Sequence, residues 1–426
     1  MDRTPLGGGA MVGLQLARHW APDEKWRLIV LGSGPESPSP SCEYARLAGV
    51  DGGLVELGEL AYARFCRDFE EQTTAWILER VGELRPADTA VVVNDISEGP
   101  TLGRLARAGY KILSIWHVDV VDYFNKLYLR RLLAPESLTR VHEKLKSAGA
   151  DWVLPDLLNL VFDKQRETVA QSRRIVVPST AMADTIRRCY GDVVGAAELD
   201  RRIAVIPWGV WSDGATLADE NRADDLRDYH KIGPDAFVLM TLSRISPEKG
   251  IHLLLEALRQ LEINGALDGK NVSLFICGEP AFMMGRSYHK QVKAAAARLK
   301  KVKVVFPGYL DAAAKRAYMR LPHLFVSPSV HESYGLNVVE AMHAGLPVLA
   351  SDHYGVRDIL PPDAGRMIHY PSPKKAPRLL AAALVELMAD RGKLRKMGEV
   401  ARAAAAAMPF SAAADAVRLA AFGMLG

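Results

Sequence analysis

The sequence has little cysteine, and it lacks several patterns by which common classes of protein are recognised. Its four cysteines, Cys42, Cys66, Cys189 and Cys277, do not stand at the spacing of zinc ligands or of a disulfide framework. No apolar run is long enough to cross a bilayer. No charged segment followed by an apolar stretch opens the chain, as it would in a secretion signal. We therefore expect a cytoplasmic protein that holds no metal ion.

A strong excess of one charge is also missing. The chain has 54 Lys and Arg against 50 Asp and Glu, a net charge of +4. This balance fits anionic ligands or a membrane surface, and no basic run with interleaved aromatics predicts nucleic-acid binding. With 426 residues, 49% of them hydrophobic, the chain is long enough for two globular domains.

The common phosphate-binding motifs are absent as well. The sequence contains no Asp-x-Asp pair and no loop of the form Gly-x4-Gly-Lys-Ser/Thr. Gly32-Ser33-Gly34 follows an expected strand, but it lacks a third glycine and runs into a segment rich in Pro and Ser. It is therefore not a dinucleotide-binding fingerprint.

What the chain does have is a regular alternation of strand-like and helix-like segments. Such alternation predicts an α/β fold with parallel sheets and helices on both faces. The expected strands are residues 27–31, 90–94, 111–116, 174–177, 203–206, 237–242, 272–277, 302–306, 323–327 and 347–350. The expected helices include residues 63–84, 248–261, 286–299, 312–320, 336–343 and 410–425.

The pattern also suggests where the domains meet. Residues 214–233 are polar, acidic and poor in apolar side chains, which predicts a linker. We expect one domain over residues 1–213, a second over 214–408, and a final helix over 409–426 that crosses back to the first. Only residues 1–6 precede the first glycine cluster, and this segment is too short and polar for a buried central strand. We therefore expect the opening strand of the first domain to be missing, either because the real start lies upstream or because the domain is incomplete.

The most informative segment runs from His331 to Ala350. Glu332 is placed in a loop, Gly335 begins a helix, and Glu340 stands eight residues after Glu332, inside that helix. The N–H groups at a helix start bind anions, and carboxylates accept hydrogen bonds from hydroxyl groups. Two surface glutamates are the alternative, which the apolar helix disfavours. The segment predicts a site for a ligand with both phosphate and sugar.

A basic pair follows the strand expected over residues 237–242. Arg244 and Lys249 stand between that strand and the next helix, and ligands of open α/β sheets collect at the carboxyl ends of strands. A guanidinium and an ammonium could neutralise a diphosphate without a metal. The alternative is that Arg244 and Lys249 form surface ion pairs, for instance with Glu248.

In the first half, His117 ends an expected strand, where it could exchange protons near neutral pH. The alternative is a capped, structural histidine. The cluster Gly7-Gly8-Gly9 precedes a helix expected to begin near Met11, and glycines allow a ligand to approach the backbone.

One further segment has the pattern of a helix that could contact a membrane. Between Tyr123 and Leu133, aromatic and aliphatic residues fall near one helical face with Lys and Arg beside them. Such a face suits peripheral contact with the inner, anionic face of a membrane. The alternative is packing against the domain.

Together these residues resemble glycosyltransferase family 4, the retaining nucleotide-sugar transferases of GT-B fold, most closely over residues 237–360. Glu332 and Glu340 match the family's Glu-x7-Glu motif, and Arg244 and Lys249 match its diphosphate clamp. The segment 206–210 resembles the family's interdomain turn, with Trp208 in place of the usual Asn. The resemblance implies two Rossmann-like, doubly wound domains that face each other across a cleft.

The resemblance also implies roles for individual residues. The catalytic residues would be His117, Glu332, Arg244 and Lys249. The donor-binding residues would be Gly8, Gly9, Ser243, Arg244, Lys249, Tyr309, Glu332, Ser333, Gly335, Leu336, Asn337 and Glu340. Neither a metal nor another cofactor would be needed.

The implied function is that of a retaining, hexosyltransferase-type enzyme. It would move a sugar from a nucleoside-diphosphate sugar to an acceptor hydroxyl on a sugar, glycan, lipid-linked molecule or metabolite. The alternatives are a catalytically silent member of the family that serves a partner transferase, and another GT-B enzyme such as a phosphorylase or epimerase.

Overall fold

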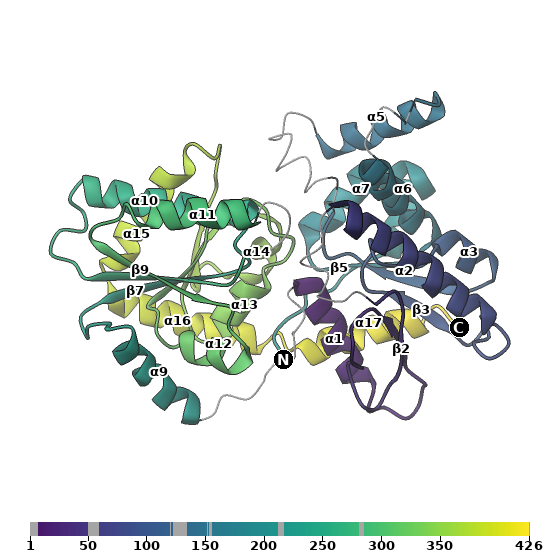
Figure 1. The fold of residues 1–426 in the computed structure, drawn as a ribbon, viewed down its shortest axis with the longest axis horizontal. Coiled ribbons are helices and arrows are strands. Elements are labelled where there is room, and N and C mark those ends of the chain that lie inside the picture. The colour runs from purple at the N-terminus through teal and green to yellow at the C-terminus, as the bar shows by residue number, and fades with distance from the viewer. Residues whose placement is uncertain are drawn as a thin grey trace. The chain divides into compact units, whose positions relative to one another are not determined.

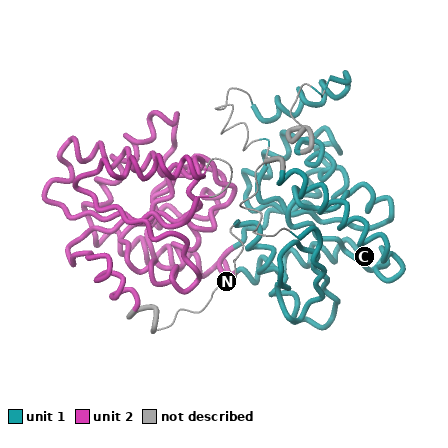
Figure 2. Tube along the Cα trace, viewed as in Figure 1, with its two compact units in different colours: residues 1–208, 410–426 teal, residues 209–409 magenta. Residues whose placement is uncertain are grey.

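The computed structural model describes residues 7–49, 59–119, 121, 134–150, 152, 156–211, 217–280 and 285–425. The chain forms two compact units (Figure 2). Unit 1 comprises Met1–Trp208 together with Phe410–Gly426, and unit 2 comprises Gly209–Pro409. The stripe predicted between Tyr123 and Leu133 lies outside the described residues.

Unit 2 is built on a six-stranded parallel sheet with the order β12-β11-β10-β7-β8-β9. Its strands are β7 Phe237–Leu242, β8 Val272–Cys277, β9 Val302–Gly308, β10 Leu324–Ser327, β11 Val348–Ser351 and β12 Gly365–Ile368. Numbered within the unit, this order reads 6-5-4-1-2-3, the order of a dinucleotide-binding doubly wound sheet. The chain changes direction across the sheet between β7 and β10. Ligands of such sheets bind at this switch point.

The helices of unit 2 pack on both faces of the sheet (Figure 1). They are α9 Leu217–Tyr229, the 3-10 turn η3 Pro247–Lys249, α10 Ile251–Ile263, α11 Gly285–Ala296, α12 Ala312–Tyr318, α13 Leu336–His343, α14 Tyr354–Ile359, α15 Ala376–Met388 and α16 Arg391–Ala406. Strands β8, β10 and β11 are buried along their whole length, because helices cover both sides of a parallel sheet. One apolar cluster joins the strands to α10 and α15.

The prediction of a linker over residues 214–233 is wrong for the part of that segment that forms helix α9. This helix is acidic and only weakly amphipathic, which is why its sequence resembles a linker. It nevertheless packs against α12. Just beyond its end, His230 Nε2 lies 2.8 Å from the hydroxyl of Tyr318, the last residue of α12. Contacts with a neighbouring helix, rather than helix propensity, therefore stabilise α9.

Unit 1 contains a four-stranded parallel sheet, β3-β4-β5-β6, and a separate parallel pair, β1-β2. The strands are β1 Ile29–Gly32, β2 Glu43–Arg46, β3 Ala90–Val93, β4 Lys111–Ile115, β5 Arg174–Val177 and β6 Ile203–Val205. Residues 1–6 lie outside the description, and β1 is the first strand of the described residues. The α/β fold class with parallel sheets in two domains is confirmed.

The helices of unit 1 include one from the far end of the chain. They are α1 Gly8–Trp20, α2 Glu59–Glu79, α3 Leu102–Arg107, α5 Pro135–Ser147, α6 Asp156–Gln171, α7 Thr180–Val194, α8 Ala196–Arg202 and α17 Phe410–Phe422. Helix α17 packs against α1 and strands β3, β4 and β5. The indole N–H of Trp20 donates to the carbonyl of Ala414 at 3.0 Å, which fixes α1 to α17.

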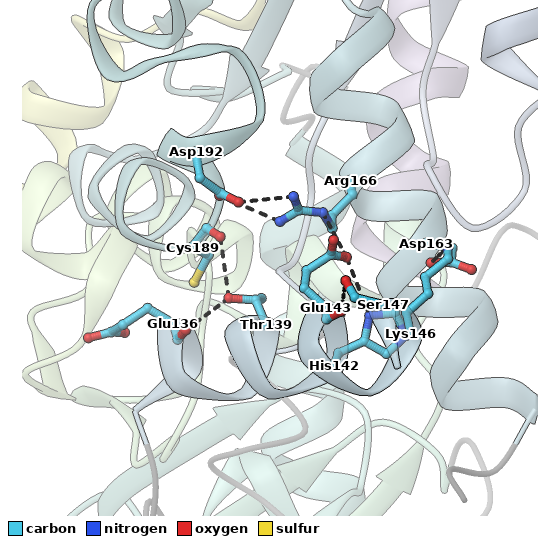
Figure 3. Close-up of polar contacts among 10 residues, drawn as sticks. All are labelled: Glu136, Thr139, His142, Glu143, Lys146, Ser147, Asp163, Arg166, Cys189 and Asp192. Carbon is cyan, nitrogen blue, oxygen red and sulfur yellow. Dashed lines mark hydrogen bonds and ion pairs between the residues drawn. The ribbon is translucent and has the colours of Figure 1, made fainter. Parts of the chain in front are cut away.

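Helix α5 is attached to α6 and α7 mainly by polar contacts (Figure 3). Its buried residues are Thr139 and His142 rather than an aliphatic stripe. The His142 ring stacks on Phe162 with ring centroids 4.6 Å apart. Arg166 bridges Glu143 and Asp192 at 2.9 Å each. Since little apolar area is buried here, this helix gains less from the hydrophobic effect than α10 does in unit 2.

Candidate functional site

The loop after β7 places its two cations with the help of a glycine. The segment 243–250 contains the turn η3 and ends at Gly250, which has a left-handed φ of 65°. A Cβ added at Gly250 would stand 2.1 Å from the carbonyl oxygen of Pro328. No other residue fits there, because both the conformation and the contact exclude a side chain. The glycine therefore brings this loop against the loop after β10.

Lys249 and Glu332 meet where these two loops come together. Lys249 Nζ lies 2.5 Å from Glu332 Oε2, and the two side chains are 11% and 16% exposed. Burial by itself would raise the pKa of Glu332. The charges of Lys249, His353 and Arg244 and the hydrogen bond from Lys249 outweigh it, so the pKa is below its usual value. Glu332 is therefore an ionised carboxylate that can only accept hydrogen bonds.

Glu248 is a residue whose part in this site the sequence did not predict. Its side chain is only 3% exposed. It accepts a hydrogen bond from Ser246 Oγ at 2.5 Å and lies 3.8 Å from Arg244 Nη2. Its backbone carbonyl accepts from Val330 N–H at 2.8 Å. Glu248 thus joins the two loops and holds Arg244. From the sequence it was expected only as the partner in a surface ion pair.

Helix α13 begins beside the same loops. Its N-cap, Gly335, has φ 106°, a left-handed conformation that favours glycine. Asn337, in the first turn, donates from Nδ2 to the carbonyl of Leu242, the last residue of β7, at 3.0 Å. The first N–H groups of a helix generally lack intrahelical partners, and the helix dipole favours an anion there. In α13 the N–H of Val338 already bonds to the carbonyl of Gly335 and to Asn337 Oδ1. The start of α13 therefore lies close to the end of β7 and its cations.

Glu340 stands one turn into α13 and has its own lysine. Lys315 Nζ, from α12, lies 2.6 Å from Glu340 Oε1, with 24% and 22% of the two side chains exposed. Each glutamate of the motif is thus paired with a different lysine. Lys315 was not predicted from the sequence, because α12 and α13 are separate in the chain and nothing in either segment indicates their contact.

The remaining predicted donor-binding residues of unit 2 differ in placement. Ser333 is buried beside Glu332. Ser243 donates from Oγ to the carbonyl of Arg244 at 3.0 Å, within the loop after β7. Leu336 is the first residue of α13. Tyr309 follows β9 and is 42% exposed. Among the described residues, no hydrogen bond or ion pair joins Tyr309 to the glutamates.

In unit 1, His117 lies between a neighbouring strand end and α1. Its Nε2 is 3.1 Å from Asn94 Oδ1, at the end of β3. Asn94 in turn donates from Nδ2 to the carbonyl of Gly9 at 3.0 Å. Burial lowers the pKa of His117 below its usual value, against the opposing effects of the charge of Asp95 and of a hydrogen bond that the ring donates to the backbone of Asn94. His117 is therefore held as a neutral ring.

The glycine cluster of unit 1 is part of a helix rather than a loop before it. The helix expected to begin near Met11 already begins at Gly8, with Gly7 as its N-cap. Glycine is a poor helix former, so the pattern predicted a later start. A Cβ at Gly9 would lie 2.8 Å from Cδ2 of His117. Gly9 thus leaves room for the histidine ring.

Two absences complete the description. Among the residues that the structure describes, no three His, Cys, Asp or Glu side chains gather closely enough to hold a metal ion. Within the same part of the chain, none of the helices combines the length and the apolar character that crossing a membrane requires.

The structure has parallel sheets in two units, with cations and carboxylates at the switch point of the sheet in unit 2. Its fold is that of the GT-B class of α/β proteins, as the solved structures described below show. Residues 223–404, inside unit 2, match the family described as Glycosyl transferases group 1. This part of the chain is similar to the members of that family. The resemblance to a glycosyltransferase predicted from the sequence is thereby confirmed.

Curated relatives match about half of the chain. The chain is 31% identical over 191 residues to a lipopolysaccharide 1,2-N-acetylglucosaminetransferase of Salmonella typhimurium, and the match covers 44% of this chain and 46% of that protein. It is 32% identical over 230 residues to a phosphatidyl-myo-inositol mannosyltransferase of Mycolicibacterium smegmatis, covering 54% and 52%. The chain thus spans about half the length of the curated relatives it matches.

Solved structures match over nearly the whole chain and support the fold. Sucrose-phosphate synthase from Thermosynechococcus elongatus aligns with a TM-score of 0.69 at 20% identity, over 96% of this chain and 92% of that one. Anabaena HepE in complex with UDP and glucose aligns with a TM-score of 0.63 at 18% identity, over 98% and 96%. At these identities the likeness establishes the GT-B fold alone.

Proposed function

We propose that the protein is a retaining glycosyltransferase. It transfers a sugar from a nucleoside-diphosphate sugar to an acceptor hydroxyl and needs no metal ion. The observation that carries this proposal is the Lys249–Glu332 pair, with Arg244 nearby, at the switch point beside the start of α13. The family match of residues 223–404 supports it.

The bond that breaks joins the anomeric carbon of the sugar to an oxygen of the diphosphate. As it breaks, the sugar becomes oxocarbenium-like and negative charge grows on the leaving oxygen. Arg244, Lys249 and the N–H groups at the start of α13 stabilise that charge. One well-placed donor in such a role contributes about 2.7–4 kcal/mol. The acceptor oxygen bonds to the same face of the anomeric carbon, and its proton passes to the leaving phosphate.

The Lys249–Glu332 pair supplies one group for the diphosphate of the donor and one for its sugar. Without a donor, the ammonium and the carboxylate neutralise each other at 2.5 Å. When a donor binds, the ammonium turns to the diphosphate and the carboxylate accepts hydrogen bonds from sugar hydroxyls. Two cationic side chains then take the part that a divalent ion plays elsewhere, which is the reason for proposing metal independence.

The acceptor side is proposed for unit 1, where His117 and Asn94 offer neutral hydrogen-bonding groups. The relatives carry names that refer to lipopolysaccharide, phosphatidyl-myo-inositol and D-inositol 3-phosphate. Since these names differ, the acceptor class is kept as a sugar, glycan, lipid-linked molecule or metabolite. Solved neighbours hold UDP or UDP-glucose, so uridine nucleotides come first among the donors to try.

A thermal-shift panel of nucleoside diphosphates and their sugars tests the donor site. We expect at least one nucleotide to raise the melting temperature, since a ligand that binds only the folded state stabilises it. The protein is then incubated with that nucleotide sugar in the presence of EDTA, and the products are analysed. We expect nucleoside diphosphate and a sugar of retained configuration to be released still. Binding without turnover would instead identify a catalytically silent member of the family.

A further inference from the structure

The second lysine–glutamate pair of unit 2 has no part in the proposed chemistry of the leaving group. Lys315 is the fourth residue of α12, and Glu340 is the fifth residue of α13. The distance of 2.6 Å from Nζ to Oε1 is that of a charge-assisted hydrogen bond. Both side chains are about three-quarters buried. The pair is therefore more than a loose contact between surface charges.

The charge of Lys315 matters because of what lies around Glu340. The proposed donor brings a diphosphate to the start of the same helix. An unpaired carboxylate one turn away would repel that diphosphate. Glu332 is balanced by Lys249, and Lys315 supplies the corresponding balance for Glu340. The site can thus carry two carboxylates for hydroxyl groups and still accept an anionic ligand.

The geometry of the pair also leaves room for hydroxyl groups. A carboxylate has about four lone-pair directions, and the ammonium of Lys315 uses one oxygen, Oε1. Two neighbouring hydroxyls, such as the 2′ and 3′ hydroxyls of ribose, need a carboxylate with a fixed plane to accept both of their hydrogen bonds. A lysine that holds one oxygen restricts the rotation of the Glu340 carboxyl group.

We propose that Lys315 is a positioning residue that holds the Glu340 carboxylate for the two ribose hydroxyls of the donor. It makes the site selective for ribonucleotides over 2′-deoxyribonucleotides. This inference rests on the proposed function, because it takes the donor to be a nucleoside-diphosphate sugar. It adds a residue of α12 that lies outside the motif of the two glutamates.

The pair could instead serve only to tie α12 to α13. Removing a structural tie would lower the melting temperature and would lower the affinity for every nucleotide by the same factor. Removing a positioning residue changes the ratio between a ribonucleotide and its 2′-deoxy counterpart. The ratio therefore separates the two roles.

The experiment is calorimetric titration of the full chain with UDP, GDP and their 2′-deoxy counterparts. In the parent we expect the ribonucleotide to bind about tenfold more tightly than the 2′-deoxy form, the difference made by one hydrogen bond to a charged group. Lys315→Met should weaken the binding of both forms, because the unpaired Glu340 then repels the diphosphate. It should weaken the ribonucleotide about tenfold more than the 2′-deoxy form, which brings the ratio close to one. Lys315→Arg should restore most of the ratio, because it keeps the charge.

Lys301→Met is the matched control, since Lys301 pairs with Asp268 on the exposed surface of unit 2. It should leave both affinities unchanged. An unchanged ratio in Lys315→Met would overturn the inference, whatever its melting temperature. The proposed function fails separately, and the inference with it, if the parent binds none of the nucleoside diphosphates of the thermal-shift panel.

Discussion

The two units carry their candidate polar residues at equivalent places, after the ends of parallel strands, but they balance charge differently. In unit 2, Glu332 and Glu340 are each neutralised by a lysine from another loop or helix. In unit 1, His117 lies against the neutral amide of Asn94, and burial lowers its pKa. Ion pairs that can exchange partners suit an anionic ligand, whereas a neutral ring suits a hydroxyl group.

The units also differ in how they are packed. Unit 2 has one large apolar cluster that runs from the sheet into α10 and α15. The described residues of unit 1 include smaller apolar clusters, and the buried residues of α5 are Thr139 and His142. A rigid, continuous core supports the close placement of charged groups that anion binding needs. The comparison predicts that changes in unit 2 affect binding of the nucleotide and that changes in unit 1 do not, so that any contact of Gly8, Gly9 or His117 with the donor is made to its sugar.

The largest effect is expected at Lys249. Lys249→Ala removes one donor to the leaving phosphate, and turnover should fall by roughly 10²–10³-fold with folding intact. The measurement is the initial rate of sugar transfer, with circular dichroism to confirm the fold. Lys301→Ala, on the exposed surface of the same unit, should keep the parental rate. Transfer at the parental rate by Lys249→Ala would show that this lysine does not contact the diphosphate.

The next change addresses unit 1. Gly9→Val places a side chain where even a Cβ lies 2.8 Å from His117, and such overpacking costs about 1–3 kcal/mol. Urea unfolding should show that loss, while calorimetric affinity for the nucleotide stays the same. Gly7→Ser is the control, because nothing lies within 4 Å of a Cβ there and serine is a good N-cap. A lower nucleotide affinity in Gly9→Val would break the comparison between the units.

A smaller effect is expected for Glu340. Glu340→Ala removes an acceptor for the ribose hydroxyls, so affinity for the nucleoside diphosphate should fall about tenfold by calorimetry. Glu386→Ala, which breaks an exposed pair with Arg366, should leave it unchanged. Equal affinities in the parent and in Glu340→Ala would remove this glutamate from the proposed site.

The last predicted effect is a pH dependence of the stability of unit 2. His323 Nδ1 accepts the backbone N–H of Val238 at 3.0 Å, which requires that nitrogen to be unprotonated. Burial and the charges of Arg391 and Arg227 lower the pKa of His323 to about 4. Between pH 6.5 and about 4 the unfolded chain binds a proton that the folded chain does not. Stability should therefore fall as pH drops through this window.

Urea unfolding at pH 7, 5.5 and 4.5 checks this dependence. His323→Gln should flatten the fall in stability with acid, whereas His369→Gln, at a side chain that is 67% exposed, should follow the parent. A parallel loss of stability in the parent and in His323→Gln would assign the acid sensitivity to other groups.

Much of unit 2 could be predicted from the sequence because its strands are continuous apolar runs. The bounds of β7, β8 and α13 are those expected from the pattern. Helix α9 was missed, because its sequence is polar and only weakly amphipathic and its contact with α12 cannot be read from the sequence. Propensity and periodicity are local, and contacts between distant segments override them.

The same limit applies to the site. Arg244, Lys249, Glu332 and Glu340 could be chosen from their positions after strands and at a helix start. The partners Lys315 and Glu248 could not, because one stands on a separate helix and the other resembles a surface residue. Only the folded arrangement shows that each glutamate of the motif has its own lysine.

The account depends on a nucleoside diphosphate binding at the two loops of unit 2. Hydrogen–deuterium exchange, measured with and without the nucleotide that raises the melting temperature most, tests this directly. We predict slower exchange in peptides that cover residues 243–250 and 331–340, and no change in α5 of unit 1. Unchanged exchange in both segments of unit 2, under conditions where the nucleotide is bound, would contradict the account.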